Sequence, residues 1–152
     1  MASLEHEMTY RIRVRGPAKA TAGSPLGERQ YWEMSDGELS GPRINARLAM
    51  PGDDCYRVGA DGFGRPDVHV AFKTDDGETV MLRYEGLVQM NETFRRAAES
   101  DATTRFEDQY IRMAMFFDTG AARYAWLNQA LFVAEGRLSG PKEVEYRIYR
   151  VT

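Results

Sequence analysis

The sequence has a single cysteine, Cys55, and only two histidines, His6 and His69, among its 152 residues. One thiol cannot form a disulfide within the chain, and so few thiols and imidazoles argue against a zinc site. No apolar run approaches the roughly 18 residues that span a bilayer. The acidic opening, Met1 to Glu7, is unlike a secretory signal. We therefore expect a cytoplasmic protein that holds no metal.

Charge and glycine patterns exclude two further classes of partner. The 20 basic residues are outnumbered by 23 acidic ones, for a formal charge of -3, whereas a protein that binds phosphate backbones needs a basic excess. The stretch from Gly59 to Gly64 is rich in glycine but falls between expected strands, so it predicts a turn rather than a phosphate loop. The expectation is a protein without a cofactor that binds neither nucleic acid nor membrane.

Alternation of polar and apolar residues with period two is the main structural signal. Tyr10 to Arg15 alternates strictly, as a half-buried strand does. The segment 123–135 is also compatible with a helix from its Ala, Leu and Trp content, but its glycine-bearing flanks favour a strand. The expected strands, about nine, are residues 10–15, 28–34, 44–50, 56–58, 67–73, 79–85, 108–118, 123–135 and 144–148.

Turns and one helix connect these strands. Asp76-Gly77 lies between two alternating segments and predicts a hairpin, and Ser35-Asp36-Gly37 predicts another turn. Residues 91–100 favour a short helix capped by Asn91, the candidate lid. The basic first strand and the acidic last strand predict a pairing that closes the sheet. We expect one domain over residues 1–152, an all-β antiparallel barrel with one short helix.

Four residues are candidates for catalysis. Asp54 follows a Pro-Gly turn and starts a strand, so it is either a buried acid or base or a turn cap. His69 shares a strand face with an acid and is either a proton shuttle or a solvent-facing residue. Tyr84 either donates to a developing oxyanion or packs in the core. Arg112, within an apolar strand, either anchors an anionic ligand group or pairs with a structural carboxylate.

Four more residues are candidates for substrate binding, each with a bland alternative. Asn128 lies in a largely apolar segment, where its amide orients a ligand carbonyl or bonds to neighbouring backbone. Trp32, Trp126 and Phe116 either line an aromatic-friendly pocket or belong to the core. The segment 108–118 is almost uniformly apolar, so both its faces are expected to be covered, and this favours a homodimer or higher homo-oligomer.

A set of short motifs, in a fixed order from about Tyr10 to Val151, resembles the bacterial domain-of-unknown-function family 3237, also called uncharacterised protein family 0311. The resemblance implies a small antiparallel barrel of lipocalin or streptavidin-like shape, often oligomeric, and implies little about chemistry. Cys55 stands where relatives tend to carry Trp, and His69 where they tend to carry Arg, so we expect a remodelled pocket if these side chains face the cavity. The motifs are Gly27-Glu28-Arg29, Gly41-Pro42-Arg43, Pro51-Gly52-Asp53-Asp54, Thr74-Asp75-Asp76-Gly77, Tyr84-Glu85-Gly86 and Arg123-Tyr124-Ala125-Trp126-Leu127-Asn128.

Three functions are compatible with these observations. The first is a cofactor-independent enzyme (an isomerase, dehydratase, cyclase or lyase) that uses acid/base chemistry on a small apolar or aromatic substrate. The second is a lipocalin-like protein that binds a small molecule without catalysis. The third is a structural or partner-binding module.

Overall fold

The computed structural model describes residues 1–19 and 23–152, in which ten strands, an α-helix and a 3-10 helix follow one another. The N-terminal half contains β1 (Leu4–Lys19), β2 (Glu28–Ser40), β3 (Asn45–Leu48), β4 (Gly52–Val58), β5 (Phe63–Arg65) and β6 (Asp67–Thr74). The C-terminal half contains β7 (Thr79–Gln89), α1 (Glu92–Ser100), β8 (Ile111–Asp118), the 3-10 helix η1 (Ala122–Gln129), β9 (Phe132–Gly140) and β10 (Glu143–Val151).

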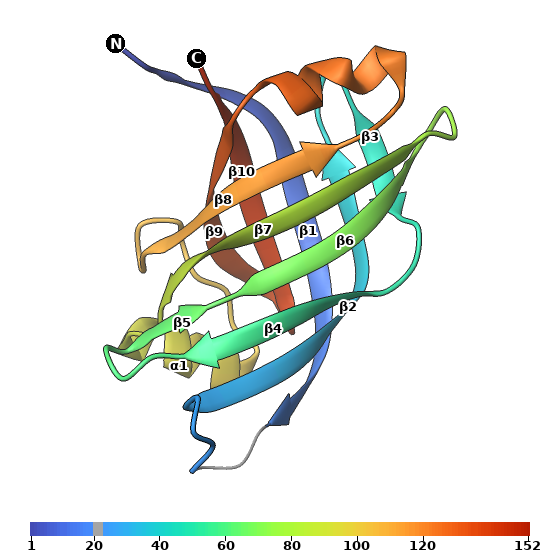
Figure 1. Cartoon of the computed structure of the whole chain (residues 1–152). Coiled ribbons are helices and arrows are strands. Elements are labelled where there is room, and N and C mark those ends of the chain that lie inside the picture. The colour runs from blue at the N-terminus through green and yellow to red at the C-terminus, as the bar shows by residue number, and fades with distance from the viewer. Residues whose placement is uncertain (20–22) are drawn as a thin grey trace.

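The strands form one sheet that closes on itself into a barrel (Figure 1). From β1 the ring passes through β10, β9, β8 and β7 to β6, and it returns through β4 and β2 to β1. The pairings are antiparallel. The predicted all-β antiparallel barrel is therefore confirmed. The barrel has ten strands rather than nine because β5, three residues long, follows the glycine-rich turn.

The seam between the first and last strands is held by the predicted charge pairing. Arg11 lies opposite Glu145 and Arg13 opposite Glu143 in the register of β1 and β10. The Nε atoms of the two arginines donate to these carboxylates at 2.8 and 3.1 Å. Since the Glu145 carboxylate also accepts from Arg137 on β9, these ion pairs tie together three strands at the point of closure.

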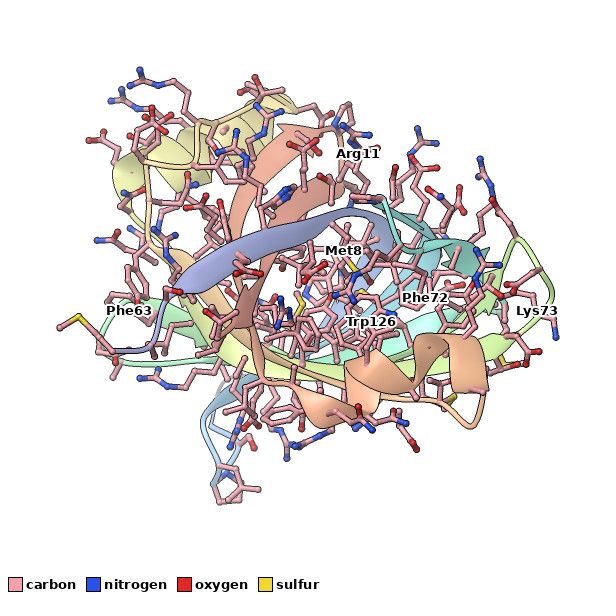
Figure 2. The ribbon with its side chains drawn as sticks, turned by 90° about the horizontal axis from the view of Figure 1, so that it is seen from above. Met8, Arg11, Phe63, Phe72, Lys73 and Trp126 are labelled. Carbon is pink, nitrogen blue, oxygen red and sulfur yellow. The ribbon has the colours of Figure 1, made fainter. Side chains whose placement is uncertain are left out.

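The core lies inside the ring and follows from the two-residue period. Met8, Tyr10 and Ile12 are almost fully buried, whereas Arg11 and Arg13, on the opposite face of the strand, are exposed. Figure 2 shows Met8, Phe72 and Trp126 inside the barrel, and Arg11 and Lys73 on its outer side. Full burial of a large apolar side chain stabilises a fold by about 1.5–3 kcal/mol. These inward rows therefore fix which face of each strand is internal.

The turn predicted at Ser35-Asp36-Gly37 is wrong, because β2 runs through it. Opposite this point the register with β1 shifts by one residue, between Arg13 and Val14, so the strand bulges instead of reversing. A Cβ on Gly37 would lie 2.8 Å from Ile12 Cδ1 and 3.0 Å from the Arg11 carbonyl oxygen. The glycine therefore serves close approach of two strands.

One other expectation also fails. Residues 123–135 do not form one strand: η1 covers Ala122–Gln129 and β9 begins at Phe132, so the helical alternative describes the first part. The 3-10 helix is held by Asn128, whose side chain accepts from Thr119 N–H at 3.0 Å and donates to the Thr119 carbonyl at 2.7 Å. Within the single chain β8 buries one face, and Phe116 on the other face is 41% exposed, so cover of that face by a second copy stays a prediction.

The two helices lie at opposite ends of the barrel (Figure 1). The 3-10 helix η1, drawn in orange, covers the end at which both chain termini lie, and α1 lies at the other end. We call these the closed end and the open end. Within residues 1–19 and 23–152, neither helix has the length and apolar character needed to cross a membrane.

Candidate active site

A cavity of about 570 Å³ lies at the open end, between α1 and the strands. Its lining is mostly apolar or aromatic and includes Trp32, Met34, Met90 and Phe94. Pockets of this size and character hold small organic molecules. The cavity is therefore the candidate site for a ligand.

Asp54 brings a buried carboxyl to this cavity. The residue is only 8% exposed and lines the cavity wall, because the two-residue period of β4 turns it inward and turns its neighbour Asp53 outward. The Asp54 Oδ1 atom accepts a hydrogen bond from the backbone N–H of Asp67 on β6, at 3.0 Å. This bond fixes one carboxyl oxygen, and no second protein donor to Asp54 is found in the described part of the chain.

Burial raises the pKa of Asp54 from 3.8 to about 6. The hydrogen bond from Asp67 N–H lowers the pKa, whereas the negative charges of Asp67 and Asp53 raise it further. A carboxyl with a pKa close to the working pH is suited to both accepting and releasing protons. Asp54 has the environment of a general acid or base.

The register of β2 and β4 places an aromatic pair beside this carboxyl. Trp32 lies directly opposite Asp54, and Gln30 lies opposite Tyr56, two residues along the same inward faces. The Trp32 indole N–H donates to Gln30 Oε1 at 3.1 Å, and the Tyr56 hydroxyl donates to the Met90 sulfur at 3.3 Å. Gly64 makes room for Tyr56, because a Cβ there would overlap the tyrosine ring and hydroxyl.

Three buried tyrosines lie where the cavity meets the core. Tyr10, Tyr84 and Tyr146 come from β1, β7 and β10, and their ring centroids are 5.8–5.9 Å apart in every pair. Burial raises the pKa of all three phenols, and the negative charge of Asp54 contributes to each rise. The carboxyl and the three hydroxyl-bearing rings therefore form one polar group of residues, of which Asp54 and Tyr146 line the cavity.

The helix α1 covers the cavity where the sequence predicted a lid. The cap at Asn91 is confirmed: its Oδ1 accepts from Phe94 N–H, and its Nδ2 donates to the Asp108 carbonyl, each at 2.9 Å. Phe94, Ala97 and Ala98 face the cavity, and Ala97 is the one buried residue of the helix. A helix with so little buried surface is attached weakly to the barrel, which suits a cover.

Of the four predicted catalytic residues, the structure brings Asp54 to the cavity and Tyr84 to the tyrosine cluster behind it. Arg112 lies on the outer face of β8, where its guanidinium is 3.7 Å from Glu135 and donates to its neighbour's carbonyl. His69 also faces outward, with Nδ1 3.6 Å from Asp53. The strand period places both away from Asp54, so the expectation of a shared cavity is not met.

Of the four predicted binding residues, only Trp32 lines the cavity. Phe116 faces outward from β8, with the Arg83 guanidinium 5.1 Å from its ring centroid. Trp126 and Asn128 belong to η1 at the closed end, where Arg43 stacks on the Trp126 ring and Asn128 bonds to backbone. Trp126 and Asn128 follow the bland alternatives, whereas Phe116, 41% exposed, lies neither in the cavity nor in the core.

Several cavity residues were missed by the sequence analysis. Tyr56, Met90, Phe94 and Tyr146 all line the cavity. Tyr56 could have been found from Asp54, since residues two apart on a strand share a face. Tyr146 required the register of β1 and β10, which places it opposite Tyr10.

Within residues 1–19 and 23–152, no three His, Cys, Asp or Glu side chains gather as metal ligands.

Comparison with known proteins places the chain in a family. The model of the family described as "Protein of unknown function (DUF3237)" matches residues 2–151. A UPF0311 protein of Clostridium acetobutylicum is 24% identical over 149 residues, covering 97% of this chain and 93% of that protein. One of Rhodopseudomonas palustris is 27% identical over 136 residues, covering 86% of each.

Solved structures share the barrel. A conserved protein of unknown function from Rhodopseudomonas palustris has a TM-score of 0.88 at 22% identity, covering 100% of this chain and 98% of its own. A β-barrel-like protein from Acinetobacter baumannii has a TM-score of 0.83 at 21% identity, with 100% and 97% covered. An enzyme from Penicillium herquei has a TM-score of 0.73 at 18% identity, with 99% and 95% covered.

Proposed function

The chain belongs to the DUF3237 family, and we propose that this member is an enzyme that uses Asp54 to move a proton on a small apolar or aromatic substrate held in the barrel. The single observation that carries the proposal is a buried carboxyl, with a pKa raised to about 6, in the wall of a mostly apolar cavity. Buried carboxyls with raised pKa values concentrate at functional sites, because such a group costs stability.

The reaction class follows from what the site supplies. Asp54 in its ionised form accepts a proton from the substrate and can return it at another atom, which describes isomerisation, dehydration, cyclisation and related lyase reactions. None of these reactions transfers electrons to a second molecule, so the substrate and one acid/base group account for all atoms. The enzyme from Penicillium herquei gives a precedent for catalysis by a barrel of this shape.

A non-catalytic binding protein is the second candidate, and the pairing of Arg112 with Glu135 outside the cavity favours it. A binding protein needs the apolar cavity but has no use for a carboxyl buried at a cost in stability. The two candidates therefore differ in whether Asp54 transfers protons.

The test uses a model substrate that loses a proton to any well-placed base. A nitro-substituted benzisoxazole loses its ring C–H proton, the electrons form a nitrile as the N–O bond breaks, and a coloured phenolate is released. We expect turnover whose rate rises with a pKa of about 6 and falls by about 100-fold or more in Asp54→Asn.

Asp53→Asn is the matched control, because Asp53 has the same charge but faces outward on the same strand. It is expected to retain the wild-type rate. If the compound binds in the cavity and wild type and Asp54→Asn react at the same rate, the protein is a binding protein and the enzymatic proposal is wrong.

A further inference from the structure

The hydroxyl groups around Asp54 have unused hydrogen-bonding capacity. The Tyr10 hydroxyl is buried beside the Tyr84 side chain and makes no hydrogen bond of standard geometry within the described residues. A buried hydroxyl without a partner is destabilising, so such groups are rare unless a ligand or water occupies the space beside them. Here the orphaned group belongs to the cluster that borders the cavity.

Tyr146 is the member of this cluster that reaches the ligand. It lines the cavity together with Asp54, and its ring stacks on Tyr10, with an interplanar angle of 22° and a centroid separation of 5.8 Å. Its other neighbour, Tyr84, meets it edge to face at 5.8 Å. Two rigid rings therefore fix the position of the Tyr146 side chain from behind.

Three other hydrogen-bond donors of the cavity wall are already engaged. The Trp32 indole donates to Gln30, and the Tyr56 hydroxyl donates to the Met90 thioether, a weak acceptor. The Lys142 ammonium donates to the Gly16 carbonyl at 2.8 Å. Within the described residues Tyr146 is the hydroxyl of the wall that is left to face a ligand beside Asp54.

We propose that Tyr146 is a catalytic residue that binds a substrate oxygen on which negative charge develops, and that Tyr10 and Tyr84 are positioning residues behind it. This inference rests on the proposed function and names its substrate class, a carbonyl compound that reacts through its enolate or phenolate. Asp54 removes the proton from the atom next to the carbonyl carbon, the C–H electrons form a C=C bond, and the carbonyl electrons move to the oxygen. In a substrate with a second C=C bond one carbon further along, Asp54 then returns the proton to the far carbon of that bond, the oxyanion electrons re-form the carbonyl, and the remaining C=C bond is conjugated with it.

The electrostatic environment keeps the donor protonated. Burial raises the pKa of Tyr146 well above its usual value, and nearby Tyr10, Asp54 and Tyr56 raise it further. Because the phenol does not ionise near neutral pH, it remains a hydrogen-bond donor throughout the working range. A hydrogen bond from a buried neutral donor to an oxyanion is among the larger contributions to catalysis of such reactions.

The test compares two ligands of nearly the same shape, para-nitrophenolate and para-nitroanisole. Only the first carries an anionic oxygen. Binding is measured at pH 8 in Asp54→Asn, which removes the repulsion between the Asp54 carboxylate and the ligand. We expect the phenolate to bind about tenfold or more tightly than the anisole, the effect of one hydrogen bond to a charged oxygen.

Adding Tyr146→Phe is expected to abolish this preference while leaving the anisole affinity within about twofold, since the ring remains. Adding Tyr10→Phe is expected to reduce the preference partially, because it removes a neighbour rather than the donor. Tyr149→Phe is the control, since the Tyr149 hydroxyl donates to Glu135 on the outer face of the barrel.

Each outcome decides one of the two proposals. The assignment of Tyr146 is overturned if the protein binds the phenolate no more tightly than the anisole. It is also overturned if Tyr146→Phe lowers the affinity for both ligands equally. The proposed role of Asp54 stands in either case. If neither ligand binds, the cavity does not hold small aromatic molecules, and the proposed function fails together with this inference.

Discussion

The two ends of the barrel each contain an aspartate whose pKa departs far from 3.8, in opposite directions. At the open end, burial raises the pKa of Asp54 to about 6. At the closed end, hydrogen bonds from the hydroxyls of Thr74 and Tyr124 lower the pKa of Asp76 to about 2. A lowered carboxyl pKa means that the fold stabilises the ionised form, whereas a raised pKa means that the fold destabilises the ionised form. The difference separates a structural carboxylate from a candidate functional one.

The same division applies to the motifs that identify the family. Three of them meet at the closed end, where they bind one another. The Asp76 carboxylate accepts from Thr74 and Tyr124 at 2.6 Å each and from Arg123 at 3.1 Å. The Arg43 guanidinium lies 3.6 Å from the centre of the Trp126 ring. These motifs therefore maintain the barrel, and their presence carries no information about a reaction.

The difference between the closed end and the open end is tested most directly by truncating one tryptophan at each end. Trp126→Ala removes the platform of Arg43 and a ring 6.0 Å from Phe132, so we expect a loss of about 3 kcal/mol in the free energy of unfolding. Trp32→Ala is expected to cost about 1 kcal/mol and to abolish binding of nitroanisole, because Trp32 packs against the core on one side only and borders the cavity. Urea denaturation and ligand titration measure the two quantities.

The comparison fails if both variants lose the same stability, or if Trp126→Ala weakens nitroanisole binding in protein that is still folded. Either result would mean that the two ends are coupled and that the closed end contributes to the site.

A second prediction concerns the stability cost of Asp54. A rise in pKa from 3.8 to about 6 corresponds to about 3 kcal/mol of unfavourable free energy once the folded protein is ionised. The folded protein holds the Asp54 proton to higher pH than the unfolded chain does. The free energy of unfolding is therefore unaffected by this cost below pH 4 and decreases as the pH rises through 6. Asp54→Asn is therefore expected to be more stable than wild type by about 1–3 kcal/mol at pH 8, and equal to it near pH 4.

Urea denaturation at a series of pH values measures this difference. Asp53→Asn removes the same charge from the outward side of β4 but keeps Asp54. It is therefore not expected to gain stability over wild type as the pH rises through 6. A difference between wild type and Asp54→Asn that is constant with pH would contradict the raised pKa.

The fold was predictable from the sequence to a greater extent than the site. Period-two alternation marked most strands, Asp76-Gly77 marked a hairpin, and opposite charges on 10–15 and 144–148 marked the seam. Local patterns failed where the partner strand decides the outcome. Gly37 has a turn-like context, yet it lies within β2, where its missing Cβ allows close approach to Ile12 on the partner strand.

The site was less predictable because it depends on which way each strand faces. Arg112 and Asp54 are both charged residues in strands, and only the register shows that one faces outward and the other inward. Tyr146 was missed because its role follows from Tyr10, which is far away in sequence and directly opposite in space. Sequence alone named Asp54, since a Pro-Gly turn before a strand places a carboxyl at a barrel end.

The smallest expected effect tests the other aspartate and must have the opposite sign. The folded-state pKa of Asp76 is lowered, so its contribution to stability is present above pH 4 and is lost as the pH falls towards 2. Asp76→Asn keeps an acceptor oxygen for Tyr124 but loses the charge, so we expect it to be less stable than wild type at pH 7 and to approach wild type near pH 2. Asp75→Asn, a change of the same charge in the same turn, is expected to leave the profile unchanged. If Asp76→Asn and Asp54→Asn depend on pH in the same direction, the hydrogen bonds at the closed end do not stabilise an ionised carboxylate, and the distinction between the two ends is lost.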